Sequence, residues 1–140
     1  MDNFAADAIY IDAPPSRVFS ALLEAEEILT WMDAETVIVE DAVGGQFTAQ
    51  RRDGSTVTGS ISILEPDERL DIANYYHEAD GDRRGPMLLC FRLESRGDGV
   101  WLVVRQEGLD TGKDWHSFAK SARQELVAIT LALKRHIEQI

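Results

Sequence analysis

The sequence predicts an α+β domain in which a curved antiparallel sheet wraps around a long C-terminal helix. Three observations favour this fold class. Short segments between residues 36 and 107 alternate apolar with polar side chains, and turns of only a few residues separate them. Consecutive strands joined by short turns form an antiparallel meander. Residues 114–139 contain neither Gly nor Pro, and a helix of roughly 25 residues spans about 38 Å, which is enough to cross a sheet.

The expected elements begin with a strand at residues 4–11, because Pro14 and Pro15 follow it and proline suits a helix start better than a ladder. Two short helices are expected next, at 16–23 and 25–31. Six strands then precede the last helix, at 36–40, 46–50, 56–63, 70–76, 87–94 and 100–107. The polar segment 77–86 is expected to be a loop around Asp80-Gly81.

Periodicity predicts which side chains face a shared interior. Alternation places Val57, Gly59, Ile61 and Ile63 on one face of their strand, and Leu70, Ile72, Asn74 and Tyr76 on one face of the next. In the last helix, a stripe with spacings of three and four predicts a buried face, made by Trp115, Phe118, Ala122, Leu126, Ile129, Leu133 and Ile137. We therefore expect one interior that includes Val57, Ile61, Ile63, Leu70, Ile72, Phe91, Leu102 and Leu126.

Composition limits the function classes. The 140 residues suit a single domain over 1–140, and an apolar fraction of 44% supports a sizeable core. The net charge of −11 argues against nucleic acid and against anionic membrane surfaces, which both need a basic footprint. The N-terminus lacks the features of a signal peptide, no run approaches the roughly 18 apolar residues of a membrane span, and a single cysteine makes no internal disulfide. A cytoplasmic protein is expected.

Motifs for metal, phosphate or nucleophilic chemistry are missing from the sequence. His77, His116 and His136 lack zinc-ligand spacing, and the glycines fit no nucleotide-binding pattern. Cys90 lies mid-strand and is interpreted as a packing residue. Residues 110–114 are interpreted as the start of a helix, where acidic side chains are favoured, rather than as a ligand loop. We therefore expect no catalytic residue, no metal and no cofactor.

The ordered set of elements resembles the helix-grip proteins of the START-like (SRPBCC) superfamily, and within it the domains similar to the activator of Hsp90 ATPase homologue 1 (AHSA1-type). Four features carry the resemblance: Ile11-Asp12-Ala13-Pro14 followed by Trp31, the glycine turn Gly44-Gly45-Gln46-Phe47, the stretch from Gly59 to Leu70 with its Glu65-Pro66, and Trp115 ahead of an amphipathic helix. The resemblance implies a helix-grip fold with a cavity between the sheet and the last helix. It also implies that Leu102, Val104 and Gln106 point inward.

The candidate site is this cavity, and its expected lining carries no charge. A charged ligand would lack a counter-ion there, so a small, largely apolar and neutral or weakly polar molecule is expected. The residues expected to form the cavity are Trp31, Phe47, Ile61, Ile63, Ile72, Asn74, Tyr76, Leu102, Val104, Gln106, Trp115, Phe118 and Ala122.

Three functions remain open from the sequence. The first is a binding module for the small molecule. The second is an enzyme of cyclase, hydrolase or lyase type that uses the same cavity, although no convincing acid/base pair is found. The third and least favoured is a co-chaperone of Hsp90, since the usual partner domain is absent from this chain. The sequence leaves a homodimer open.

Overall fold

A computed structural model describes residues 3–110 and 113–139 of the chain. The strands and helices follow the expected order. The strands are β1 (Phe4–Ile11), β2 (Ala34–Val39), β3 (Gln46–Arg51), β4 (Thr56–Glu65), β5 (Arg69–Ala79), β6 (Asp82–Arg96) and β7 (Gly99–Glu107). The helices are α1 (Pro15–Leu23), α2 (Ala25–Trp31), the 3-10 turn η1 (Lys113–Trp115) and α3 (His116–Glu138).

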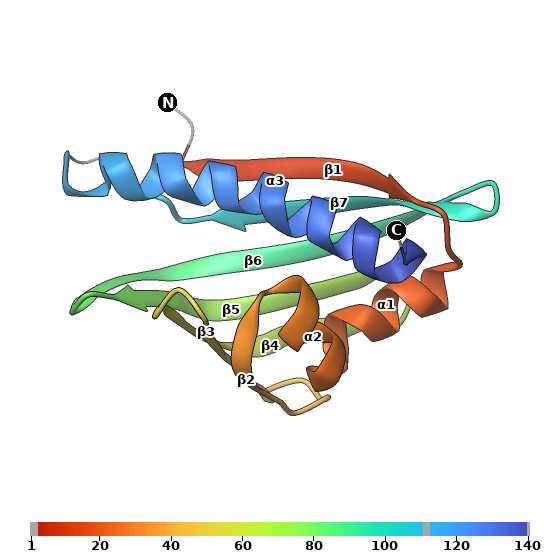
Figure 1. The fold of residues 1–140 in the computed structure, drawn as a ribbon, viewed down its shortest axis with the longest axis horizontal. Helices are drawn as coiled ribbons and strands as arrows, with labels where there is room; N and C mark the ends of the chain where they lie inside the picture. Colours follow the sequence, from red (N-terminus) through yellow and green to blue (C-terminus); the bar gives the residue numbers. More distant parts are fainter. Residues whose placement is uncertain (1–2, 111–112, 140) are drawn as a thin grey trace.

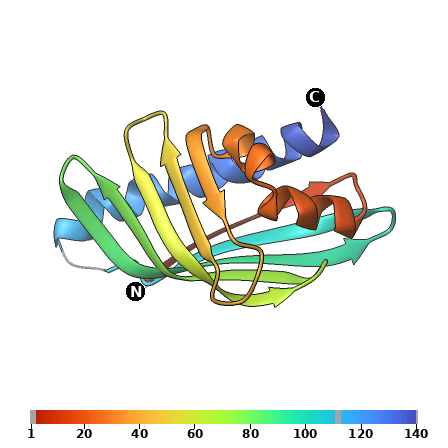
Figure 2. The same ribbon diagram turned by 90° about the horizontal axis from the view of Figure 1, so that it is seen from below.

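The seven strands form one antiparallel sheet in the order β1-β7-β6-β5-β4-β3-β2. The sheet is curved, and the three α-helices lie on its concave face (Figures 1 and 2). The chain therefore has the α+β helix-grip architecture that the sequence predicts. No helix within the described residues has the length and apolar character needed to cross a membrane.

Helix α3 packs mainly along β1 and touches β7, α1 and α2. Its inner face buries a row of apolar side chains at spacings of three and four, with Ala122, Leu126, Ile129 and Leu133 among them. Because α3 follows the β1 edge, the concave face of β3, β4 and β5 is only partly covered by it (Figure 1). This offset determines where a cavity forms.

The predicted loop at 77–86 is wrong, because β5 and β6 extend through most of it. They meet in a tight turn at Asp80 and Gly81, which have φ values of 52° and 79°. Cross-strand pairing continues almost to that turn, with Glu78 opposite Arg83 and an ion pair between them of 2.9 Å. Polar residues are compatible with strands at such an exposed hairpin end, so polarity alone is a poor sign of a loop.

The predicted interior is correct except at Ile63. Val57, Ile61, Leu70, Ile72, Phe91, Leu102 and Leu126 all have relative exposures of 1% or less. The pairing of β4 with β5 shifts register between Ile61 and Ile63. An irregularity of this kind exchanges the two faces of a strand. Leu64 consequently packs against the buried cluster, whereas Ile63 is half-buried outside it.

Candidate functional site

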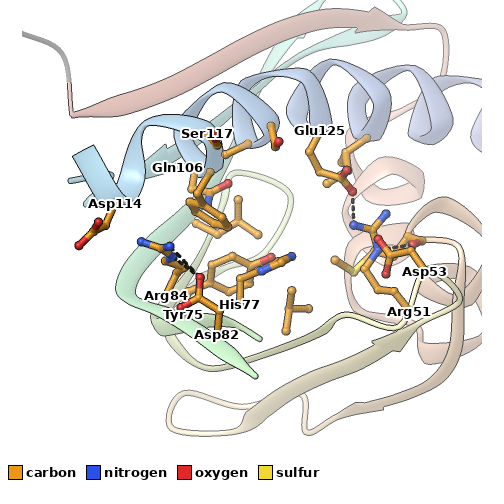
Figure 3. A pocket seen from close by; sticks show the side chains of 17 residues that line it. Arg51, Asp53, Tyr75, His77, Asp82, Arg84, Gln106, Asp114, Ser117 and Glu125 are labelled. Atoms are coloured by element: carbon orange, nitrogen blue, oxygen red, sulfur yellow. Dashed lines mark hydrogen bonds and ion pairs between the residues drawn. The ribbon is translucent and has the colours of Figure 1, made fainter. Parts of the chain in front are cut away.

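A cavity of about 410 Å³ lies between α3 and the strands that α3 leaves partly uncovered. Its volume falls within the range of small-molecule sites, roughly 300–1,000 Å³. Figure 3 shows its walls, formed by α3 above and by β3 to β7 and the end of α2 around it. The lining residues are Met32, Arg51, Asp53, Val57, Tyr75, His77, Asp82, Arg84, Leu89, Gln106, Asp114, Ser117, Phe118, Ser121, Ala122, Glu125 and Ile129.

The middle of the cavity wall is apolar and partly aromatic. Val57 and Leu89 supply apolar surface from the sheet, and Ala122, Ile129 and the half-buried Phe118 supply it from α3. A ligand that covers these side chains would remove apolar area from water, worth roughly 25 cal/mol per Å². An apolar ligand body therefore suits this part of the cavity.

A bulge in β5 decides which of its side chains reach the cavity. Asn74 has a φ of 49°, and the pairing with β6 shifts register between Ile72 and Tyr75. From that point onward the odd-numbered residues face inward, so Tyr75 and His77 line the cavity. The expectation that Asn74 and Tyr76 share the face of Ile72 is therefore wrong. Asn74 is exposed.

Tyr76 lies on the opposite face of the sheet from the cavity. The guanidinium carbon of Arg83 lies 3.8 Å from the centroid of its ring. This cation–π contact gives Tyr76 a surface role, and the side chain is half-buried.

Tyr75 places a hydroxyl group in the cavity wall. The residue is only 5% exposed, and none of the described residues forms a hydrogen bond with its hydroxyl. Burial raises the pKa of Tyr75 well above its ordinary value of 10.0. The phenol is therefore neutral and has a proton to donate. Because Tyr75 lines the cavity, its hydroxyl can donate to a bound ligand or water there.

Gln106 provides a second buried polar group, from β7. It is 7% exposed, and its Nε2 donates to Met87 Sδ at 3.2 Å. Its carbonyl oxygen has no hydrogen-bond donor among the residues that the structure describes. The inward orientation implied by the family resemblance is confirmed for Gln106, and the side chain offers an acceptor close to the N-terminal part of α3 (Figure 3).

His77 adds an imidazole that is half-buried in the cavity wall. Its ring centroid lies 5.1 Å from that of Phe118. Burial lowers the pKa of His77 below 6.5, although nearby Asp53 and other carboxylates oppose this effect. The ring is therefore neutral near pH 7 and has one donor and one acceptor nitrogen.

A charged cluster closes the cavity at the end of β3. Arg51 donates from Nε to the carbonyl oxygen of Met32 at 2.8 Å and forms an ion pair with Glu125 of α3. Asp53 lies beside them (Figure 3) and accepts hydrogen bonds from the backbone and hydroxyl of Ser55, at 2.8 and 2.5 Å. The side-chain hydrogen bond from Ser55 is the main cause of a lowered pKa for Asp53.

A second charged cluster lies on the other side of the cavity, made by Arg84, Asp82 and Asp114 (Figure 3). Arg84 forms a hydrogen bond and an ion pair with Asp82, at 2.8 and 2.7 Å. Its guanidinium carbon also lies 5.2 Å from the ring centroid of Trp115. The expectation that no charged side chain lines the interior is therefore wrong. With charged side chains in its lining, the cavity does not require a neutral ligand.

The structure divides the predicted site residues between the cavity, the core around it and positions outside both. Gln106, Phe118 and Ala122 line the cavity. A second group is buried in the core around it: Trp31, Phe47, Ile61, Ile72, Leu102 and Val104. Trp115 packs edge-on against Phe118 at 5.6 Å and borders a shallow depression beside Gly108, outside the main cavity. Ile63, Asn74 and Tyr76 lie elsewhere.

Trp31 has a clear structural role. Its Nε1 donates to the carbonyl oxygen of Ala21 at 2.8 Å, and its ring packs edge-to-face on Phe91. The indole thereby joins α2 to α1 and to the sheet.

No signal in the sequence marks the polar cavity residues, such as Arg51, Tyr75, His77 and Glu125, because their orientation depends on bulges and on where elements end.

Among the described residues, no group of three or more His, Cys, Asp and Glu side chains is arranged to hold a metal ion. Cys90 is buried. Burial in the first place, and nearby Asp71, raise the pKa of Cys90 to about 12. A thiol of this kind stays protonated near neutral pH and is a poor nucleophile.

Comparison with known families identifies the chain. Residues 12–134 match the family model described as activator of Hsp90 ATPase homolog 1-like protein. The chain belongs to this AHSA1-like family. No curated protein matches the chain at a significant level.

Solved structures of similar proteins agree on the fold. A Mesorhizobium loti protein, MLL2253, is 18% identical with a TM-score of 0.80, and the match covers 97% of each chain. The Colwellia psychrerythraea Aha1 dimer is 16% identical with a TM-score of 0.77 and 96% coverage of each chain. Protein CV1439 of Chromobacterium violaceum is 23% identical, with a TM-score of 0.77 and 99% coverage of each chain. These AHSA1-like neighbours support the fold alone.

Proposed function

We propose that this AHSA1-like domain binds a small molecule with a largely apolar body in the cavity between the sheet and α3. The carrying observation is the cavity of about 410 Å³, whose middle is lined by apolar side chains such as Val57, Leu89 and Ile129 and whose wall also contains the nearly buried polar residues Tyr75 and Gln106. Pockets that bind small molecules combine apolar walls with a few polar groups that orient the ligand. Tyr75 and Gln106 have that role in this proposal.

The second candidate is an enzyme that uses the same cavity. The observation in its favour is His77, a neutral imidazole without a hydrogen-bond partner among the described residues, in a wall that also contains Tyr75. A neutral histidine can act as a general base. The binding role ranks first because it requires only the cavity and its polar groups, whereas catalysis also requires a reacting substrate.

Two further proposals concern the surroundings of the protein. One solved neighbour is described as a dimer, and we propose that self-association of this chain be tested by light scattering. A cytoplasmic location is proposed from the single cysteine and the acidic composition. We do not propose that the protein stimulates Hsp90. The cavity is suited to a small molecule, and no feature of the described surface indicates Hsp90 as a partner.

The binding proposal is tested by filling the cavity. Ala122→Phe places a bulky side chain from α3 into it, whereas Ala128→Phe makes the same change at an exposed position of the same helix. Native mass spectrometry of each protein after purification from cells should detect a co-purified molecule on the wild type and on Ala128→Phe. Loss of that mass from folded Ala122→Phe, checked by circular dichroism, supports the proposal. An unchanged adduct on Ala122→Phe would contradict it.

A further inference from the structure

The two arginines in the cavity lining are more buried than the carboxylates that pair with them. The Arg51 side chain is 13% exposed, and that of its partner Glu125 is 39% exposed. The Arg84 side chain is 18% exposed, and that of its partner Asp82 is 60% exposed. The other described carboxylates of the lining belong to exposed residues. Water screens exposed charges more than buried ones, so the arginines act most strongly on a ligand inside the cavity.

The two arginines differ in what their guanidinium groups already hold. Arg51 donates to the carbonyl oxygen of Met32 and pairs with Glu125, and it thereby joins β3 to α2 and α3. Arg84 uses its Nε and Nη2 for a single oxygen, Oδ2 of Asp82, at 2.8 and 2.7 Å. A guanidinium has five N–H groups, and the other three of Arg84 have no hydrogen-bond acceptor within the described part of the chain. Arg84 is therefore the cation whose donors are least committed to the fold.

Aromatic rings hold the Arg84 guanidinium at the N-terminal end of α3. Its central carbon lies 5.2 Å from the ring centroid of Trp115 and 6.0 Å from that of Phe118. Figure 3 shows Arg84 at the same end of the cavity as Asp114 and Ser117, which lie in η1 and in the first turn of α3. The positive end of the helix dipole adds to the positive charge there.

Two further donors follow Arg84 along the β5–β6 hairpin. His77 lies directly opposite Arg84 in the ladder and lines the cavity. Its neutral ring has one N–H group, which forms no hydrogen bond with any described residue. Tyr75, only 5% exposed, lines the cavity two residues earlier, and its hydroxyl has a proton but no acceptor among residues 3–110 and 113–139. The wall thus presents a line of donors that a ligand with acceptor oxygens can satisfy.

We infer that the ligand has an apolar, aromatic-sized body and a carboxylate group that binds to Arg84. The inference rests on the proposed binding function and names its ligand class. A guanidinium can give a carboxylate two parallel N–H bonds, and such charged hydrogen bonds are stronger than neutral ones. His77, as the cross-strand neighbour of Arg84, can donate to the same group. The body then lies against Phe118 and along the apolar wall towards Ile129.

Two effects oppose an anionic ligand, and both are weakened by water. Asp82 remains beside Arg84 as a like charge, but its side chain is 60% exposed. The net charge of −11 repels anions at long range, but salt at physiological strength screens exposed charges beyond about 8 Å. The contact with the partly buried Arg84 is local and is screened less. Removal of the Asp82 charge should therefore tighten the binding of a carboxylate.

The test uses three probes that share one aromatic body: naphthaleneacetate, naphthaleneethanol and naphthaleneethylamine. Isothermal titration at pH 7 and physiological salt should give the acetate at least about a tenfold lower Kd than the amine, which corresponds to about 1.4 kcal/mol. The alcohol should lie between them.

Variants assign the preference to Arg84. Arg84→Gln should raise the Kd of the acetate about tenfold and change that of the alcohol by less than about twofold. Arg83→Gln removes the same charge from the next residue, whose guanidinium stacks on Tyr76 on the opposite face of the sheet, and should leave both values unchanged. Asp82→Asn should lower the Kd of the acetate severalfold, because it removes the competing carboxylate. Circular dichroism checks that each variant is folded.

The outcomes separate the two proposals. Equal or tighter binding of the alcohol or the amine by the wild type would overturn the carboxylate inference and leave the binding function standing. A preference for the acetate that persists in Arg84→Gln would also overturn it, as would weaker binding of the acetate by Asp82→Asn. Failure of every probe to bind, at concentrations up to their solubility, would contradict the proposed function itself.

Discussion

Gly59 lies at a bulge in β4, where a side chain would collide with the neighbouring strand. A Cβ atom built on Gly59 would lie 2.5 Å from Cγ2 of Ile72 and 3.0 Å from the carbonyl oxygen of Ala73. Ile72 is fully buried. We expect Gly59→Ala to lower the free energy of unfolding by about 1–3 kcal/mol through overpacking.

Urea denaturation of single and double variants measures this effect. Ile72→Ala removes the nearer of the two contacts, so the additional cost of Gly59→Ala should fall in that background, as a double-mutant cycle detects. Equal costs in both backgrounds, or an unchanged unfolding midpoint for Gly59→Ala, would contradict the close approach.

Cys90 should behave as an inert thiol in the folded protein. Its pKa is raised to about 12, first by burial. Only about one thiol in ten thousand is then ionised at pH 8. We expect a disulfide-based thiol reagent to label the native protein at least about a hundredfold more slowly than the urea-unfolded protein. Cys90→Ser, which removes the single cysteine of the chain, supplies the background rate. Rapid stoichiometric labelling of the native protein would refute this prediction.

Asn74 explains why the sequence identified the strand but not its inward residues. A positive φ is uncommon outside glycine, and asparagine is among the residues that tolerate it. The bulge at Asn74 moves Tyr75 and His77 onto the cavity face. A single extra residue reverses the faces of everything that follows it. No alternation rule applied to residues 70–76 detects this change.

At the scale of elements, α3 packs against the rest of the domain through one face only. Replacing neighbouring side chains of α3 by alanine should therefore change the stability of the protein by different amounts. Leu126 is 1% exposed, whereas Val127 is 55% exposed. We expect Leu126→Ala to cost about 2–5 kcal/mol, because it leaves a hole beneath the helix. Val127→Ala should change stability by no more than about 0.5 kcal/mol. Thermal unfolding of both variants checks this, and similar costs would contradict the orientation of α3.

The contact that joins all three helices should depend on pH. Glu27 of α2 lies 2.7 Å from Arg17 of α1 and 2.9 Å from His136 of α3. Burial alone would raise the pKa of Glu27, but the hydrogen bonds from His136 and Arg17 outweigh it and lower the pKa below its ordinary value of 4.5. A lowered pKa means that the ionised carboxylate stabilises the fold above pH 4.5. This contribution is lost as the pH falls through the folded-state pKa.

We therefore expect Glu27→Gln to destabilise the protein by about 1 kcal/mol at pH 7, the size of a partly exposed charged hydrogen bond. The difference from the wild type should shrink when the pH is lowered to 3. The neighbouring exposed residue gives a matched control, since Glu26→Gln should show neither effect. A constant difference between pH 7 and pH 3 would count against the contact.

At the scale of the whole molecule, sequence periodicity was sufficient for the architecture. The bounds of β1 match the predicted strand, and the order of the strands and α-helices was predicted correctly. The predicted stripe of the last helix is buried from Ala122 to Ile137, whereas Trp115 lies in η1, before α3 begins. These features depend on local patterns that each segment carries by itself. The cavity depends instead on the offset of α3 toward β1 and on bulges in β4 and β5. Such features arise from packing between segments, which a single sequence does not encode in any local pattern.

The charged ends of the cavity were missed for a related reason. Arg51 ends β3, and Glu125 precedes the stripe residue Leu126 on α3. Both positions are typical of solvated side chains when considered alone. They meet only because the curved sheet brings the end of β3 under the helix (Figure 3).

The account depends most on the cavity as the place where a small molecule binds. The most direct measurement is mapping of backbone amide chemical shifts by NMR during titration with naphthaleneethanol, a small aromatic probe without charge. The account predicts that the largest shift changes occur at the cavity residues Tyr75, His77, Gln106 and Phe118, with saturation at a single site. Changes centred instead on Val127 and Leu131, on the exposed face of α3, would contradict it.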